Sequence, residues 1–174
     1  MKRNCLPIRC AQAGFTLVEA LVTFLILAIG LLGLAGLQAK GLTFDQSAYQ
    51  RTQAALLASD IADRMRANVA ATRLSEYKIA HGATKSEQVC VGTSANCSTA
   101  QLAQFDLYQW KLALKGLLPS GDGSIATAAN VALAPMLDVT INVYWDELRN
   151  GATGINCPRL SDSDLMCFQL QVTL

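Results

Sequence analysis

The sequence predicts an α+β fold in which one long N-terminal helix packs on a small antiparallel β-sheet. An apolar run from residue 15 to 37 contains a single charged side chain, and the stretch that follows, to residue 73, has no proline. Two segments near the C-terminus instead alternate apolar and polar side chains, which is the pattern of half-buried strands. At 174 residues, the chain has room for one domain beside the long helix.

Residues 15–37 are long enough to cross a membrane as a helix. At a rise of 1.5 Å per residue they span roughly 34 Å, whereas the apolar core of an ordinary secretory signal has only about 7 to 15 residues. Lys2, Arg3 and Arg9 precede the run, and the next basic residue is Lys40. The positive-inside rule therefore predicts a cytoplasmic N-terminus and export of everything that follows Lys40.

The apolar run carries two features that a simple membrane anchor does not need. Glu19 lies near its start, and an ionisable group in hydrocarbon costs about 3 kcal/mol on insertion scales, which makes Glu19 a functional hypothesis. Gly30, Gly33 and Gly36 recur every three residues and give one flank of the helix a smooth strip for close helix packing.

We expect the helix to continue without interruption from about Phe15 to Arg73, with residues 38–73 as its amphipathic half. The predicted buried stripe comprises Leu42, Tyr49, Leu56, Leu57, Ile61, Met65 and Val69. This stripe needs a surface to pack on, and residues 74–174 are the candidate globular domain.

Residues 74–174 contain the signals for a second helix and for strands. Ser98 and Gln101 form a capping-box pattern that opens a helix at about 99–117. The two clear strands are Leu137 to Trp145 and Phe168 to Leu174. Weaker strand signals lie at about Glu87 to Gly92 and Ile125 to Ala134.

Four of the six cysteines, Cys90, Cys97, Cys157 and Cys167, follow the apolar run. Their position favours disulfides in an oxidising compartment such as a periplasm. Zinc is the alternative, but gaps of six and nine intervening residues do not match the usual ligand spacing of two to four. Of the three possible pairings we favour the local ones, Cys90 with Cys97 and Cys157 with Cys167.

Composition and motifs argue against several function classes. The formal net charge of +1 and the lack of basic clusters exclude a general nucleic-acid binder. The only histidine, His81, lies in a polar stretch without a catalytic motif, so we predict no enzyme and no cofactor. Asp122, Asp162 and Asp164 lack EF-hand spacing, and we interpret them as turn residues rather than calcium ligands.

Other polar and aromatic residues have a structural and a functional interpretation. The charged group in the amphipathic half of the helix is a candidate surface for a partner, although Asp60 and Arg64 also have the spacing of an ordinary helix pair. This group comprises Asp60, Asp63, Arg64 and Arg66. Trp110 and Trp145 fall on the apolar faces of their elements and are predicted core residues.

The stretch "GFTLVEALV" resembles the type III signal of type IV pilins and type II secretion pseudopilins. The resemblance implies that residues 1–14 are a leader, that prepilin peptidase cuts after Gly14, and that the new N-terminal residue, Phe15, is methylated. It also implies that Glu19 pairs with the N-terminal amine of a neighbouring subunit. Such pairing is favourable because opposite charges attract more strongly where the dielectric constant is low.

Three longer stretches are similar to minor pilins of the PilV group, the type IV pilus modification proteins. They read "LAIGLLGLAGLQAKGL", "SAYQRTQAALLASDIADRMRANV" and "DLYQWKLALKGLLPSGDG". The resemblance implies a single-pass inner-membrane precursor with a periplasmic domain, which joins other minor pilins, the major pilin and a tip adhesin in the pilus. It further implies roles in priming pilus assembly, twitching motility and adhesion.

Three alternatives remain open. A minor pseudopilin of a type II secretion system shares the N-terminal motif. A membrane-anchored periplasmic binding domain would have the same helix but would never polymerise. A secreted enzyme with an uncleaved anchor would need a pocket that is lined by His81 and an acid.

Overall fold

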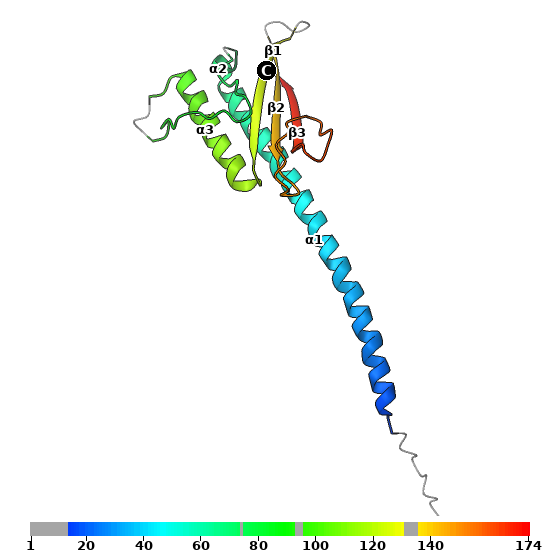
Figure 1. Ribbon diagram of the computed structural model, residues 1–174. Coiled ribbons are helices and arrows are strands. Elements are labelled where there is room, and N and C mark those ends of the chain that lie inside the picture. Colours follow the sequence, from blue (N-terminus) through cyan, green and yellow to red (C-terminus); the bar gives the residue numbers. More distant parts are fainter. Residues whose placement is uncertain (1–13, 74, 93–95, 131–135) are drawn as a thin grey trace, which may run out of the picture. The chain divides into compact units, whose positions relative to one another are not determined.

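The computed structural model describes residues 14–73, 75–92, 96–130 and 136–174, so most of the predicted leader lies outside the described residues. The chain divides into two compact units, Met1–Phe44 and Asp45–Leu174. Helix α1, Leu17–Ala67, belongs to both units. The second unit contains the rest of the described secondary structure, with two further helices and a three-stranded sheet (Figure 1).

The long helix ends earlier than predicted. α1 stops at Ala67, and a short helix α2, Val69–Arg73, follows it, so the expectation of one uninterrupted helix to Arg73 is wrong. The break is at Asn68, whose buried side-chain amide donates a hydrogen bond to the Thr99 carbonyl oxygen at 2.8 Å. The backbone bonds continue across this residue, because the Asn68 N–H donates to the Arg64 carbonyl oxygen at 3.0 Å and the Asn68 carbonyl oxygen accepts the Thr72 N–H at 3.2 Å.

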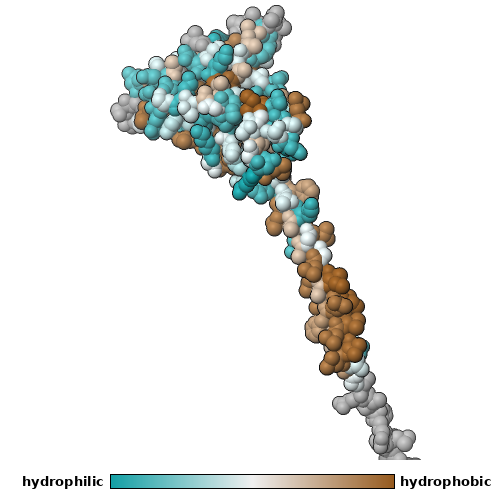
Figure 2. All heavy atoms as spheres, viewed as in Figure 1, coloured by the Kyte–Doolittle hydropathy of each residue, from teal (hydrophilic) through white to brown (hydrophobic). Residues whose placement is uncertain are grey.

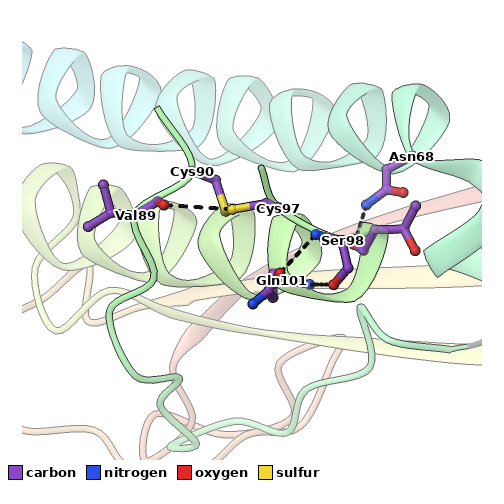
Figure 3. The surroundings of a disulfide bond; sticks show 7 residues. Asn68, Val89, Cys90, Cys97, Ser98 and Gln101 are labelled. Atoms are coloured by element: carbon purple, nitrogen blue, oxygen red, sulfur yellow. Dashed lines mark hydrogen bonds between the residues drawn. A yellow bond between two sulfur atoms is a disulfide. The ribbon is translucent and has the colours of Figure 1, made fainter. Parts of the chain in front are cut away.

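Helix α3, Thr99–Leu117, begins and ends where the sequence predicts. The Ser98 hydroxyl accepts the Gln101 backbone N–H, and the Gln101 side chain accepts the Ser98 N–H, so both halves of the capping box are present (Figure 3). The helix buries one face, on which Ala103, Leu107, Trp110 and Leu114 lie.

The sheet has the order β1-β2-β3 and is antiparallel throughout. β2, Leu137–Trp145, has the predicted bounds, and β3, Met166–Thr173, nearly has them. Ile141 lies opposite Ile125 on one side and Leu170 on the other, so the apolar residues of all three strands share a face. The polar residues alternate onto the opposite face, as expected for a sheet that is covered on one side.

Two weaker strand predictions need correction. β1 is Asp122–Ala129, which begins before the predicted Ile125 to Ala134, and the end of that prediction lies partly outside the described residues. Residues 87–92 form no strand. The edge of β1 is instead paired at Ile79, which exchanges two backbone hydrogen bonds with Ile125, at 3.1 and 2.8 Å. Ile79 was missed because one bridging residue is too short to show an alternating pattern.

The hydrophobic core lies between the sheet and the pair α1 and α3, which cover the same face (Figure 1). More than half of the predicted stripe is wrong, because Leu42, Tyr49, Leu56 and Val69 are exposed. The α1 face that is buried alternates small and large apolar residues: Ala54, Leu57, Ala58, Ile61, Ala62 and Met65. Alanines allow the helix to approach its neighbours closely, and the large indoles of Trp110 and Trp145 fill the space, as predicted for the core.

The structure contains the two local disulfides, Cys90–Cys97 and Cys157–Cys167. The first closes a short loop directly before α3, and Figure 3 shows Cys97 beside the Ser98 cap. In the same view Cys97 Sγ lies 3.6 Å from the Val89 carbonyl oxygen, but a sulfur in a disulfide has no proton to donate. The second disulfide connects the loop between β2 and β3 to the start of β3.

Gly123→Ala is expected to lower the free energy of unfolding by about 1 to 3 kcal/mol. An added Cβ on Gly123 would overlap the Trp110 indole and lie 2.9 Å from the Asn142 carbonyl oxygen. Denaturant unfolding of the full chain in detergent micelles measures the change.

Gly116→Ala is the matched control for that experiment. A Cβ there meets no atom within 4 Å, and alanine favours the helix, so stability should rise by about 0.5 to 1 kcal/mol. Equal effects of the two substitutions would contradict the close packing of β1 against α3.

Candidate functional site

The predicted processing site lies directly before the first turn of α1. Gly14 and Phe15 precede the helix, and Phe15 is 68% exposed. The Thr16 hydroxyl accepts the backbone N–H of Glu19 at 3.2 Å, the bond that a residue at the N-terminal cap makes. This contact was missed in the sequence, although "TLVE" has the spacing of a capping box.

Glu19 therefore has a local role that the sequence interpretation overlooked. It lies in the first turn of α1, where a carboxylate interacts favourably with the positive end of the helix dipole. Within the part of the chain that the structure describes, no basic side chain forms an ion pair with Glu19. The first unit thus presents a helix N-terminus with an exposed acid beside its own predicted cleavage point.

The N-terminal half of α1 has an apolar surface that no other part of the described chain covers. One 18-residue window of this helix has a mean hydropathy of 2.6 and none of it buried, so by length and composition it can cross a membrane. Figure 2 shows this segment as a continuous band of hydrophobic residues. Gly30, Gly33 and Gly36 leave open space where a Cβ would stand, which permits close approach of another helix.

In the second unit, a buried polar network joins α1, α3 and the chain after α2. The Tyr77 hydroxyl donates to Asp106 at 2.6 Å, and Arg64 approaches the other oxygen of Asp106 at 3.3 Å. The Asn68 amide donates to the Tyr77 oxygen. Burial raises the pKa of Tyr77 above its usual value, and the bond to Asp106 acts in the same direction, so the hydroxyl stays protonated as a donor.

The predicted partner surface is therefore partly used inside the second unit. Arg64 pairs with Asp60 at 2.9 Å, as its spacing predicts, and also reaches Asp106 on α3. Arg66 pairs with Asp63 on the helix surface, where both side chains are at least half exposed. Of the two arginines, Arg66 is the one that remains available to a partner.

A second buried charge pair joins α3 to the start of β1. The Lys111 ammonium donates to Asp122 at 2.5 Å, to the Gly123 carbonyl at 2.6 Å and to the Ala80 carbonyl at 3.3 Å. The turn interpretation of Asp122 is wrong, since this residue begins β1 and anchors a core lysine. Its signal in the sequence was weak, because "SGDGS" looks like an exposed turn.

The two partners respond differently to burial. Burial lowers the pKa of Lys111, while the contact with Asp122 opposes that change. Burial alone would raise the pKa of Asp122, but hydrogen bonds from Lys111 and from the backbone N–H groups of Gly82 and Gly123 outweigh it and hold the pKa below its usual value. Asp122 is therefore a carboxylate at neutral pH.

His81 does line a cavity together with Asp122, the arrangement that the enzyme alternative requires. Its Nε2 lies 3.6 Å from an Asp122 oxygen, and its ring packs edge to face on Tyr144. In the described residues, however, no serine or cysteine side chain hydrogen-bonds His81, and Asp122 is held by Lys111. The Ser-His-Asp geometry of nucleophilic catalysis is not assembled here.

The loop between β2 and β3 is organised by Asp164, which supports its interpretation as a turn residue. Its carboxylate accepts the Leu160 and Ser161 N–H groups, the Ser161 hydroxyl and the Asn156 amide. These bonds lower its pKa against the opposing effect of burial. Asp162 is exposed and pairs with Arg159 three residues before it.

Comparisons with known families match the N-terminal part of the chain. The family described as the prokaryotic N-terminal methylation motif matches residues 9–35, and the family described as type IV pilin Tt1218 matches residues 36–108. Together the two matches cover residues 9–108, more than half of the chain. Comparisons with curated proteins and with solved structures gave no match.

Asp122→Asn is expected to lower the free energy of unfolding by about 3 kcal/mol at pH 7, because Lys111 loses its anion. The difference in the free energy of unfolding between wild type and Asp122→Asn should become smaller as the pH falls below about 4. A carboxylate whose pKa is lower in the folded state stabilises it above the unfolded pKa of about 3.9 and loses this contribution in acid.

Unfolding of the full chain between pH 7 and pH 3 measures this dependence. Asp63→Asn is the control, since this exposed pair with Arg66 should contribute little at any pH. If the free energies of unfolding of wild type and Asp122→Asn differ by the same amount at pH 3 and at pH 7, Asp122 is not a stabilising carboxylate paired with Lys111.

Proposed function

Because the chain belongs to the type IV pilin family, we propose that it is a minor pilin of a type IV pilus, of the PilV group. Proteins of this family are structural, and the chain is therefore not an enzyme. The methylation motif implies processing by prepilin peptidase and assembly with other pilins. In this proposal cleavage follows Gly14, and methylation is on Phe15.

The observation that carries the proposal is an exposed acid at the head of an uncovered apolar helix. The second unit has its own core, so the first half of α1 is not needed to complete that core. Its side chains are instead free to face lipid first and other helices later. Gly30, Gly33 and Gly36 provide the strip along which a neighbouring helix approaches.

Glu19 gives the assembly its register. Cleavage after Gly14 creates a positively charged amine on Phe15, and an isolated charge of either sign is costly among packed apolar helices. Pairing Glu19 of one subunit with the amine of the next removes both penalties at a single relative position. The local role of Glu19 at the helix N-terminus is compatible with this pairing, because the exposed carboxylate retains unused acceptor positions.

The proposed location follows from the same helix. Before assembly the protein spans the inner membrane once, with a cytoplasmic N-terminus and residues 74–174 in the periplasm. The two disulfides fit an oxidising compartment. After assembly it joins other minor pilins, the major pilin and a tip adhesin in the fibre, where it primes polymerisation and supports twitching and adhesion.

Glu19→Gln is expected to leave membrane insertion intact and to reduce the amount of this protein in sheared fibres at least about tenfold, since an unpaired buried amine costs more than 1.4 kcal/mol. Immunoblots of membranes and of sheared fibres measure the two pools. Asp45→Asn is the matched control and should incorporate normally. Normal incorporation of Glu19→Gln would favour the membrane-anchored binding domain that does not polymerise.

The mature N-terminus provides an independent test. Mass spectrometry of the protein from sheared fibres should find a chain that begins at an N-methylated Phe15, because the proposed cleavage follows Gly14. A chain that begins elsewhere, or that is absent from fibres, would overturn the processing scheme.

The N-terminal motif is shared with pseudopilins, so the remaining alternative is a minor pseudopilin of a type II secretion system. A deletion strain separates the two. Loss of twitching with normal secretion supports the pilus, whereas loss of secretion with normal twitching supports the pseudopilin.

A further inference from the structure

A cavity of about 450 Å³ opens on the second unit, away from every residue used in the assembly proposal. Its walls are the loop 81–84, the end of α3 with the turn 120–122 that follows it, the loop 151–153, and Leu165. Its volume falls in the range of small-ligand sites, roughly 300 to 1,000 Å³. The polar side chains that line it include His81, Lys115 and Asp122.

The cavity has a surplus of positive charge. Lys115, in the last turn of α3, and His81 both line it. Asp122 also lines it, but Lys111 occupies one of its oxygens, and the Gly82 N–H occupies the other at 2.5 Å. Among the described lining residues no other acid is present, so the cavity offers the Lys115 ammonium and no free carboxylate.

The walls are positioned before any ligand arrives. The His81 ring packs edge to face against Tyr144, with centroids 5.1 Å apart, and its Nε2 lies beside Asp122. Ser120 adopts a φ of +51°, a left-handed conformation that is uncommon for a residue other than glycine. Strained residues of this kind concentrate at binding sites, where the surrounding structure holds them in place.

We propose that this cavity binds the carboxylate of an acidic peptide segment, with the Lys115 ammonium as the cation and the His81 ring as a neighbouring polar contact. A carboxylate fits better than a metal ion because both oxygens of Asp122 are already engaged. It fits better than a phosphate because Lys111 and Lys115 exceed Asp122 by one positive charge, which a single negative charge balances. The small wall residues Gly82, Ala83, Gly151 and Ala152 leave room for a peptide backbone.

This site goes beyond the proposed function and does not depend on it. Glu19 and the apolar helix act in the first unit, whereas the cavity belongs entirely to the second. If the cavity binds no peptide, the pilin proposal still stands. If the protein is not incorporated into fibres, the peptide-binding proposal still stands.

The test uses the isotope-labelled full chain in detergent micelles. Acetyl-Gly-Asp-Gly-amide is titrated while the NMR signals of the His81 ring and the amides of Gly82 and Gly121 are followed. We expect saturable shifts with this peptide, and binding at least about fivefold weaker with acetyl-Gly-Asn-Gly-amide, which lacks the charge. Lys115→Met should weaken binding of the acidic peptide about threefold, as expected for a partly exposed charge pair.

Lys78→Met is the matched control, because Lys78 is exposed and lies outside the cavity lining. It should leave binding unchanged, and His81→Gln should weaken it. Equal binding of the Asp and Asn peptides, equal effects of Lys115→Met and Lys78→Met, or tighter binding of inorganic phosphate than of the acidic peptide would each overturn the proposal.

Discussion

The structure depends on one constraint: the first half of α1 is apolar, and the chain supplies nothing in its described residues to cover it. Full burial of a leucine or isoleucine side chain is worth about 1.5 to 3 kcal/mol, so a surface of this size cannot remain in water. The exposed fraction of Leu17 is 76% and that of Leu32 is 73%. A membrane or other helices must therefore complete the protein, and Glu19 limits which arrangements of those helices are favourable.

The second half of α1 differs from the first, because it packs inside the second unit and needs a fixed position there. That position is held by close apolar packing and by two buried networks of hydrogen bonds and ion pairs. Arg64, Asp106 and Tyr77 connect α1 to α3, and Lys111 and Asp122 connect α3 to β1. A buried charge that loses its partner is heavily penalised, so these bonds favour one relative placement of the elements over similar ones.

The sequence predicted the elements with strong periodicity and missed those defined by single contacts. α3 and β2 were placed correctly, since a capping box and nine alternating residues are local signals. The side-chain contact of Asn68 and the pairing of Ile79 involve partners 31 and 46 residues away, which no local pattern reports. Asp122 was misinterpreted for the same reason, because its lysine partner comes from another element.

The residues of the proposed processing site were easier to identify from the sequence than the contacts that they make. A peptidase recognises a short stretch of chain, so residues 14–19 identify themselves in the sequence without reference to the fold. The bond from the Glu19 N–H to Thr16 adds a physical reason for their order: the residues proposed to specify cleavage also begin the helix. Cleavage after Gly14 would leave this capping contact intact and place the new amine one residue before Thr16. The helix that must pack in the fibre would thus keep its N-terminal cap when the leader is removed.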